Sequence, residues 1–340
     1  MRALPSAERL ACLIVGVLML LVALRGQFGP TPIIWPSFTS KLLMPLAFLV
    51  TGLALRMFTA NARSAAVLVA MGLYPLFATA LSLACYLAFP LSRPLIDEQL
   101  MALDALFFDW GAAVARMAEY PTLSALLRWV YLSSLFQLLA LLLWLGATGR
   151  VARLQALQLT GMLAGCMTLA FWLIWPSFGP SAHIALAPGT EAAANLLVTN
   201  AYGAHLMHLA EHGVARIENH LLLGTVAFPS FHIVMAFMAV AFSRGTLLFW
   251  PLVVLNLLMV PATLVHGGHY AVDLLGGAVV FALALHLVGR LMAGSATEPA
   301  PAPVPAPGSE IAAHEKPGIL GGAAQGAGLV HRLLPFRLRV

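Results

Sequence analysis

The chain has 340 residues, of which 61% are hydrophobic and only 9% are charged. Soluble globular domains carry about 25% charged residues, so this composition excludes a soluble protein unless its apolar surface faces lipid. The formal net charge of +5 is small, and we attribute it to membrane topology and a basic tail. We therefore expect membrane lipids, and no nucleic acid, as partners.

Long apolar stretches recur along the chain, and stretches of about 18 residues or more are typical of membrane-spanning helices. The first follows a basic start but lacks a signal-peptide cleavage site, because Arg25 stands where small residues are needed. We predict an all-α integral membrane protein with about eight spans, at residues 9–25, 41–58, 64–90, 122–147, 152–175, 226–243, 246–265 and 270–293.

Two shorter segments have the pattern of amphipathic helices. Residues 97–117 place apolar residues at helical spacing with acidic residues opposite, and residues 201–223 are similar but richer in histidine. Such helices lie at the membrane surface or pack between spans, and the sequence leaves both open. From residue 294 the chain is rich in Pro and Ala, which is typical of a segment without a packed core.

Lysine and arginine residues predict the orientation of the spans. With the N-terminus in the cytoplasm, twelve of the eighteen fall on the cytoplasmic side and six on the outer side. Several of the twelve lie in short connections, where the positive-inside rule is strongest. We expect a bacterial inner (cell) membrane protein with both termini cytoplasmic.

Polar residues stand at the start of two apolar segments. "PSFH" at 229–232 precedes one, and "HGGHYAVDLLGG" at 266–277 opens another. Their histidines His232 and His269 are 37 residues apart. The predicted topology places both at the outer face. His269 and Asp273 are four residues apart and share a helix face, so the sequence predicts that His232, His269 and Asp273 converge.

This trio suits acid–base and nucleophilic chemistry. A carboxylate on one ring nitrogen fixes the tautomer and leaves the other nitrogen free as nucleophile or base, and a second histidine can act as general acid. Backbone N–H groups at the start of a helix bind anions such as phosphate. Two alternatives stay open: a metal site on one helix face formed by His205, His208 and His212, and a transporter or proton relay that uses the same His/Asp cluster.

The two motifs resemble those of the type 2 phosphatidic acid phosphatase superfamily of membrane lipid phosphatases and phosphotransferases. Phe231 in place of the usual glycine resembles the branch that contains inositol phosphorylceramide synthase. The resemblance implies a catalytic helical bundle at 64–293, after two N-terminal spans at 1–63 and before the tail at 294–340. It also implies a lipid phosphate substrate, a phosphohistidine on His269, orientation of that ring by Asp273, and no cofactor or metal ion.

The resemblance further implies that His232 protonates the leaving oxygen, and that substrate is bound by Ser230, Phe231, Gly268, His266 and Arg216. The family's cationic positions differ here, however. The first motif, a lysine followed by Arg-Pro, is absent, and Ala262 and Thr263 stand where the third motif usually has Ser-Arg. Arg216 and His266 are the two candidates from the sequence for stabilising the transition-state charge.

Overall fold

The computed structural model describes residues 4–59 and 61–296. These residues are helical and contain no strand; Ile33 and Ile217 form an isolated parallel bridge. The chain divides into two compact units, residues 1–285 and residues 286–340, and every site residue discussed below belongs to the first. Residues 297–340, which hold almost all of the predicted tail, lie outside the described residues.

Each of the eight predicted spans contains a helix, which confirms the prediction of an all-helical membrane protein. Within the described ranges, six helices are long and apolar enough to cross a bilayer. They are α1 (Ser6–Phe28), α2 (Thr39–Phe58), α3 (Ala62–Tyr86), α8 (Val151–Ile174), α12 (Phe249–His266) and α13 (Ala271–Ala296).

The other two predicted spans are not single long helices. The fourth is a pair, α6 (Pro121–Leu132) and α7 (Ser134–Ala147), bent by 47°. The bend falls at Ser133 and Ser134, and serine pairs are a common cause of such kinks. The sixth, α11 (Phe231–Ser243), has 13 residues and is about 20 Å long, shorter than a bilayer core. It begins only after Pro229, which disfavours helix at the residue before it.

The spans α3 and α8 form the centre of the bundle. More than half of the apolar window of each is buried, and α3 packs against α1, α2, α7 and α8. A buried polar cluster ties α1, α2 and α8 together. Arg56 Nε donates to Glu8 at 3.0 Å, a second guanidinium nitrogen pairs with the other Glu8 oxygen, and Gln155 donates to Glu8 at 2.9 Å. Every charge in this cluster is therefore paired.

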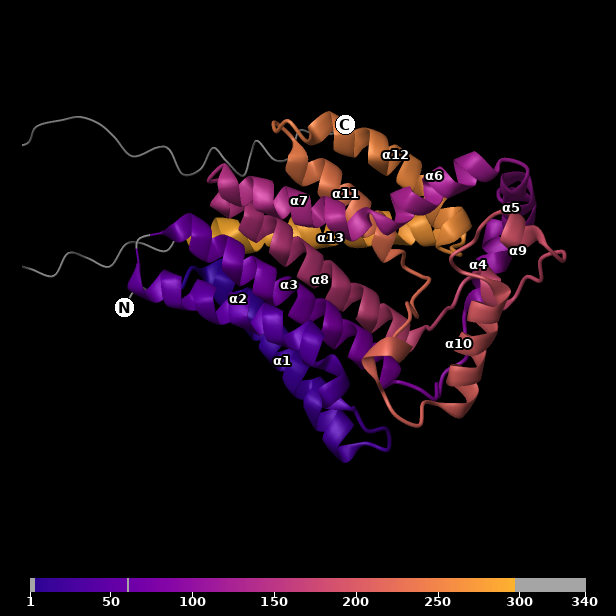
Figure 1. Cartoon of the computed structure of the whole chain (residues 1–340), viewed down its shortest axis with the longest axis horizontal. Helices are drawn as coiled ribbons and strands as arrows, with labels where there is room; N and C mark the ends of the chain where they lie inside the picture. Colours follow the sequence, from indigo (N-terminus) through magenta and orange to yellow (C-terminus); the bar gives the residue numbers. More distant parts are fainter. Residues whose placement is uncertain (1–3, 60, 297–340) are drawn as a thin grey trace, which may run out of the picture. The chain divides into compact units, whose positions relative to one another are not determined.

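Short helices gather at one end of the bundle, at the right of Figure 1. They are α4 (Asp97–Asp104), α5 (Trp110–Ala118), α9 (Thr190–Ala193) and α10 (Asn200–His212). The connections between helices also contain three 3-10 turns, η1 (Trp35–Phe38), η2 (Pro180–Ala182) and η3 (Asn219–Leu221). The segments 97–117 and 201–223 therefore contain helices, as the sequence predicts, and these helices lie at one end of the bundle.

The expectation that the acidic residues of 97–117 all face away from the apolar side is wrong for two of them. Asp97 and Asp104 are almost fully buried. Asp97 accepts hydrogen bonds from the backbone N–H groups of Phe178 and Gly179, and Asp104 accepts one from Val272 in the first turn of α13. Backbone donors that would otherwise be unpaired stabilise these buried carboxylates.

Candidate active site

His269 and Asp273 form a buried pair at the start of α13. His269 lies in the turn between α12 and α13, and its Nδ1 is 3.0 Å from Asp273 Oδ2. The same oxygen accepts the backbone N–H of Tyr270 at 2.9 Å. An ionised carboxylate can only accept hydrogen bonds, so beside an ionised Asp273 the Nδ1 atom is the protonated ring nitrogen. The Nε2 atom of His269 is thereby left with its lone pair.

Two glycines make this turn possible. Gly268 has φ +59°, and a Cβ there would lie 2.8 Å from Val198 Cγ1. A Cβ on Gly267 would lie 2.8 Å from His269 Cδ2 and 2.8 Å from a ring carbon of Tyr131. Any larger residue at 267 would therefore push the His269 ring away from its neighbours.

His232 lies in the first turn of α11 and faces the His269 ring, with 6.2 Å between ring centroids. Its other neighbour is Tyr131 at the end of α6, which stacks on it at 4.1 Å and 22°. The structure thus brings together the three residues that the sequence predicts to converge: His232, His269 and Asp273.

The beginnings of α11 and α13 are held against each other by backbone contacts. Ser230 N donates to the Asp273 carbonyl oxygen at 3.0 Å. A Cβ on Gly276 would lie 2.6 Å from the Phe228 ring, and one on Gly277 would meet the Ser230 carbonyl. Gly276 and Gly277, which end the stretch "HGGHYAVDLLGG", thus let α13 approach "PSFH" closely.

Three buried polar atoms at this place have no hydrogen-bond partner within the described part of the chain. They are Ser230 Oγ, the Tyr270 hydroxyl and Asp273 Oδ1. Burial, reinforced by the carboxylates of Asp97, Asp273 and Asp104, raises the pKa of Tyr270, so its hydroxyl stays protonated and can donate. Native proteins seldom leave such groups unpaired; the two hydroxyls can donate hydrogen bonds, whereas the carboxylate oxygen can only accept them. Phe231, the first residue of α11, is half-buried beside them.

One face of α6 adds three residues that sequence reasoning missed: Ser124, Arg128 and Tyr131. Ser124 contacts His266 through its carbonyl oxygen, which lies 2.9 Å from His266 Nε2, and through its hydroxyl at 3.3 Å. Arg128, one turn further along α6, donates to the carbonyl and side-chain oxygens of Asn195. The spacing of i, i+4 and i+7 in an apolar span is the signal that could have revealed this face.

The two cation candidates from the sequence occupy different surroundings. His266 is fully buried and is held by Ser124, next to the turn that contains His269. Arg216 lies on an exposed loop, where its Nε is 2.5 Å from Glu218 Oε1 and its side chain is 66% exposed. The neighbouring Ile217 pairs with Ile33, so this loop contacts the connection between α1 and α2.

The histidines of α10 have neighbours of their own. The rings of His208 and His212 stack with 4.4 Å between centroids, and both residues are exposed. No group of three or more His, Cys, Asp or Glu side chains that could hold a metal ion occurs among the residues that the structure describes.

The candidate site is thus a buried His–Asp pair that faces a second histidine within an all-helical membrane bundle. The model of the PAP2 superfamily, the type 2 phosphatidic acid phosphatases, matches residues 98–287, more than half of the chain. The chain belongs to this superfamily, whose members are generally phosphatases of membrane lipid phosphates. No curated protein and no solved structure matches the chain.

Proposed function

We propose that this protein is a lipid phosphatase or head-group phosphotransferase that works through a phosphohistidine on His269. The observation that carries the proposal is the contact between His269 Nδ1 and Asp273 Oδ2. It leaves Nε2 as an unprotonated nucleophile in a buried site and places a negative charge where the ring becomes positive during attack.

The chemistry runs in two steps. His269 Nε2 forms a bond to phosphorus while the bond from phosphorus to the lipid oxygen breaks, and the leaving oxygen takes a proton from His232, which enters this step as an imidazolium. Water or an alcohol then attacks the phosphohistidine, gives its proton to His232 and frees Nε2. The 6.2 Å between the two rings suits two groups that act on one phosphoryl group.

Phosphate oxygens need donors and a cation in this site. We propose that Ser230 Oγ and the free N–H groups at the start of α11 donate to them, since helix N-termini favour anions. In this proposal Phe231 and Gly268 also contact the substrate. For the cation we favour Arg128 over Arg216, because Arg128 lies one turn along α6 from Ser124, which contacts His266, whereas Arg216 is exposed and paired with Glu218.

Within the superfamily we propose a relationship to the branch that contains inositol phosphorylceramide synthase. The support is Phe231 in "PSFH" and the absence of the usual first-motif cations. In this proposal the acceptor is an alcohol rather than water, and the lipid is a sphingolipid. Head-group exchange between lipids, measured beside phosphate release, separates the two outcomes.

The test is turnover by the purified full-length protein with a panel of lipid phosphates. His269→Ala should lower the rate by about a thousandfold or more, because it removes the nucleophile. The matched control is His208→Ala, an exposed histidine on α10, which should leave the rate unchanged. Retained activity in His269→Ala, or loss in His208→Ala together with inhibition by EDTA, would reject the phosphohistidine mechanism.

The cation is tested in the same assay. Arg128→Met should reduce turnover by about a hundredfold, the usual effect of removing one group that stabilises transition-state charge. Arg216→Met should change the rate little. The reverse order of the two effects would assign this role to Arg216.

A further inference from the structure

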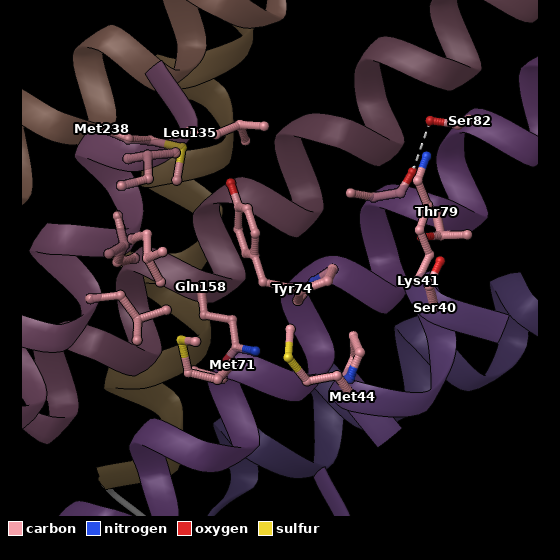
Figure 2. Close-up of a pocket in the computed structure, with 18 of the residues that line it drawn as sticks. Ser40, Lys41, Met44, Met71, Tyr74, Thr79, Ser82, Leu135, Gln158 and Met238 are labelled. Carbon is pink, nitrogen blue, oxygen red and sulfur yellow. Dashed lines mark hydrogen bonds between the residues drawn. The ribbon is translucent and has the colours of Figure 1, made fainter. Parts of the chain in front are cut away.

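A cavity of about 530 Å³ lies within the bundle between α2, α3, α7, α8 and α11. Figure 2 shows Tyr74 and Gln158 at its centre, Leu135 and Met238 on one side, and Ser40, Lys41 and Ser82 on the other. Its walls are mainly methionine, leucine, alanine and proline side chains. Cavities of this size are typical of small-molecule and lipid sites.

Two buried polar atoms in this apolar cavity have no partner within the described residues. They are the Tyr74 hydroxyl and Gln158 Nε2, and Gln158 is only 3% exposed. An unpaired amide or hydroxyl in apolar surroundings is costly, and both of these atoms can donate. The cavity is therefore built for a ligand that is mostly hydrocarbon but carries an oxygen acceptor.

The dimensions of the cavity match one leaflet of a bilayer. Its lining on α3 runs from Ala70 to Ser82, a rise of about 18 Å, and half of a bilayer core is about 15 Å. Met44 and Leu135 line it and are largely exposed, so it opens to the side where lipid lies.

The polar end of the cavity carries a positive charge. Lys41 lies in the first turn of α2 next to Ser40, and both line the cavity. This end of α2 is joined to the loop before α11, because Asn219 N donates to Ser37 Oγ and Leu222 also lines the cavity. A lysine near a helix end extends its ammonium to the membrane interface, where lipid phosphates lie.

We propose that this cavity binds one hydrocarbon chain of an anionic bilayer lipid, with the lipid phosphate at Lys41 and a carbonyl oxygen at Tyr74 and Gln158. The apolar walls exclude water from the hydrocarbon chain. The Tyr74 hydroxyl and Gln158 Nε2, which have no other partner among the described residues, favour a lipid whose carbonyl oxygen enters the cavity. This site requires no chemistry at His269. Ser40 to Ser82, about half of the lining, lies outside the family match at 98–287.

The test is photo-crosslinking of full-length protein in phosphatidylcholine nanodiscs with a phosphatidylglycerol probe that carries a diazirine on one acyl chain. Cross-linked peptides are mapped by mass spectrometry, so the result does not depend on turnover. We expect cross-links on α3 between Met71 and Ala78 and on α7 between Leu138 and Leu142. Cross-links spread evenly over exposed lipid-facing residues such as Leu275 and Val279 of α13 would overturn the proposal.

Matched variants make the test specific. Ala78→Phe fills the cavity and should reduce these cross-links by about fivefold or more, since overfilling a packed site is costly. Ala140→Phe, on the exposed side of α7 and outside the lining, should not. Lys41→Gln should lower labelling by this probe but not by a phosphatidylcholine analogue.

The proposal stays testable if Ala78→Phe does not fold. Excess unlabelled phosphatidylglycerol should then abolish cross-links within the cavity of the wild-type protein and leave those at Leu275 and Val279 unchanged. Equal competition at both places, or unchanged labelling in a folded Ala78→Phe protein, would contradict a built lipid site.

Discussion

The carboxylate of Asp273 accepts hydrogen bonds from His269 and from the Tyr270 amide through a single oxygen. Asp273→Asn keeps the size of the side chain but removes the charge that stabilises an imidazolium, and its amide favours the wrong ring tautomer. We expect turnover to fall by about a hundredfold or more, as with the aspartates of catalytic triads. Asp109→Asn, at the exposed N-cap of α5, is the control and should have little effect in the same phosphate-release assay. A near-normal rate in Asp273→Asn would give Asp273 a packing role instead.

Gly267 separates His269 from Tyr131, and a Cβ on it would lie 2.8 Å from each ring. Gly267→Ala should therefore shift the nucleophile, and displacements near 1 Å reduce turnover by about a hundredfold. Gly16→Ala on α1 has open space around it and should leave activity unchanged. Equal activities of the two variants would mean that the turn tolerates a side chain and that its geometry does not position His269.

At the level of single residues, the sequence was sufficient to predict the convergence of His232, His269 and Asp273. The i, i+4 spacing and the placement of both motifs at helix starts contain that information. The i, i+4 and i+7 spacing marks a face of α6, but it does not show that Tyr131 stacks on His232 or that Ser124 contacts His266. Those contacts depend on how α6 bends and packs, which is a tertiary property.

The cluster of Glu8, Arg56 and Gln155 joins three helices that are far apart in sequence. Arg56→Met leaves the buried Glu8 carboxylate without its counter-charge, and breaking a buried ion pair in this way costs about 3–5 kcal/mol. We expect a clear loss of thermal stability in detergent, measured by the unfolding midpoint.

The double variant Glu8→Gln with Arg56→Met should recover part of this stability, because it removes both charges. Arg9→Met is the matched control, because Arg9 follows Glu8 in α1 but is exposed, and this variant should unfold like the wild type. If Arg56→Met were as stable as the control, the cluster would not hold α1, α2 and α8 together.

At the level of helices, hydrophobic runs predicted where each apolar segment lies but not its form. The apolar residues of 122–147 continue without interruption, so their pattern does not predict the helix break at Ser133. The predicted span 226–243 is helical only from Phe231. Polarity also misled the reading of Asp97 and Asp104, since an acidic residue normally indicates a solvated face. Their burial follows from backbone donors supplied by the segments around Phe178 and Val272, which only the folded chain brings near.

The arginine distribution predicts that the histidines lie at the outer face of the membrane. The prediction is tested by single cysteines in a background in which Cys12, Cys85 and Cys166 are replaced. Ala187→Cys lies in the exposed segment before α9, and Leu247→Cys lies between α11 and α12, where Leu247 is 81% exposed. A membrane-impermeant thiol reagent applied to intact cells should label the first and spare the second.

Labelling of Leu247→Cys alone would place the histidines on the cytoplasmic side. Labelling of both positions would mean that the short helix α11 does not separate them across the bilayer. Gly267 is unsuited to this experiment, because a side chain there would contact His269 and Tyr131.

For the molecule as a whole, the central claim is that His269 carries the phosphoryl group during turnover. The most direct measurement is to react the purified protein with a ³²P-labelled lipid phosphate, quench it in alkali, and map the labelled peptide by mass spectrometry. A phosphohistidine survives alkali and is lost in acid, so the two quenches identify the bond. We predict alkali-stable, acid-labile label on His269 in the wild-type protein and none in His269→Ala. Label on another residue, or turnover that persists in His269→Ala, would contradict the mechanism.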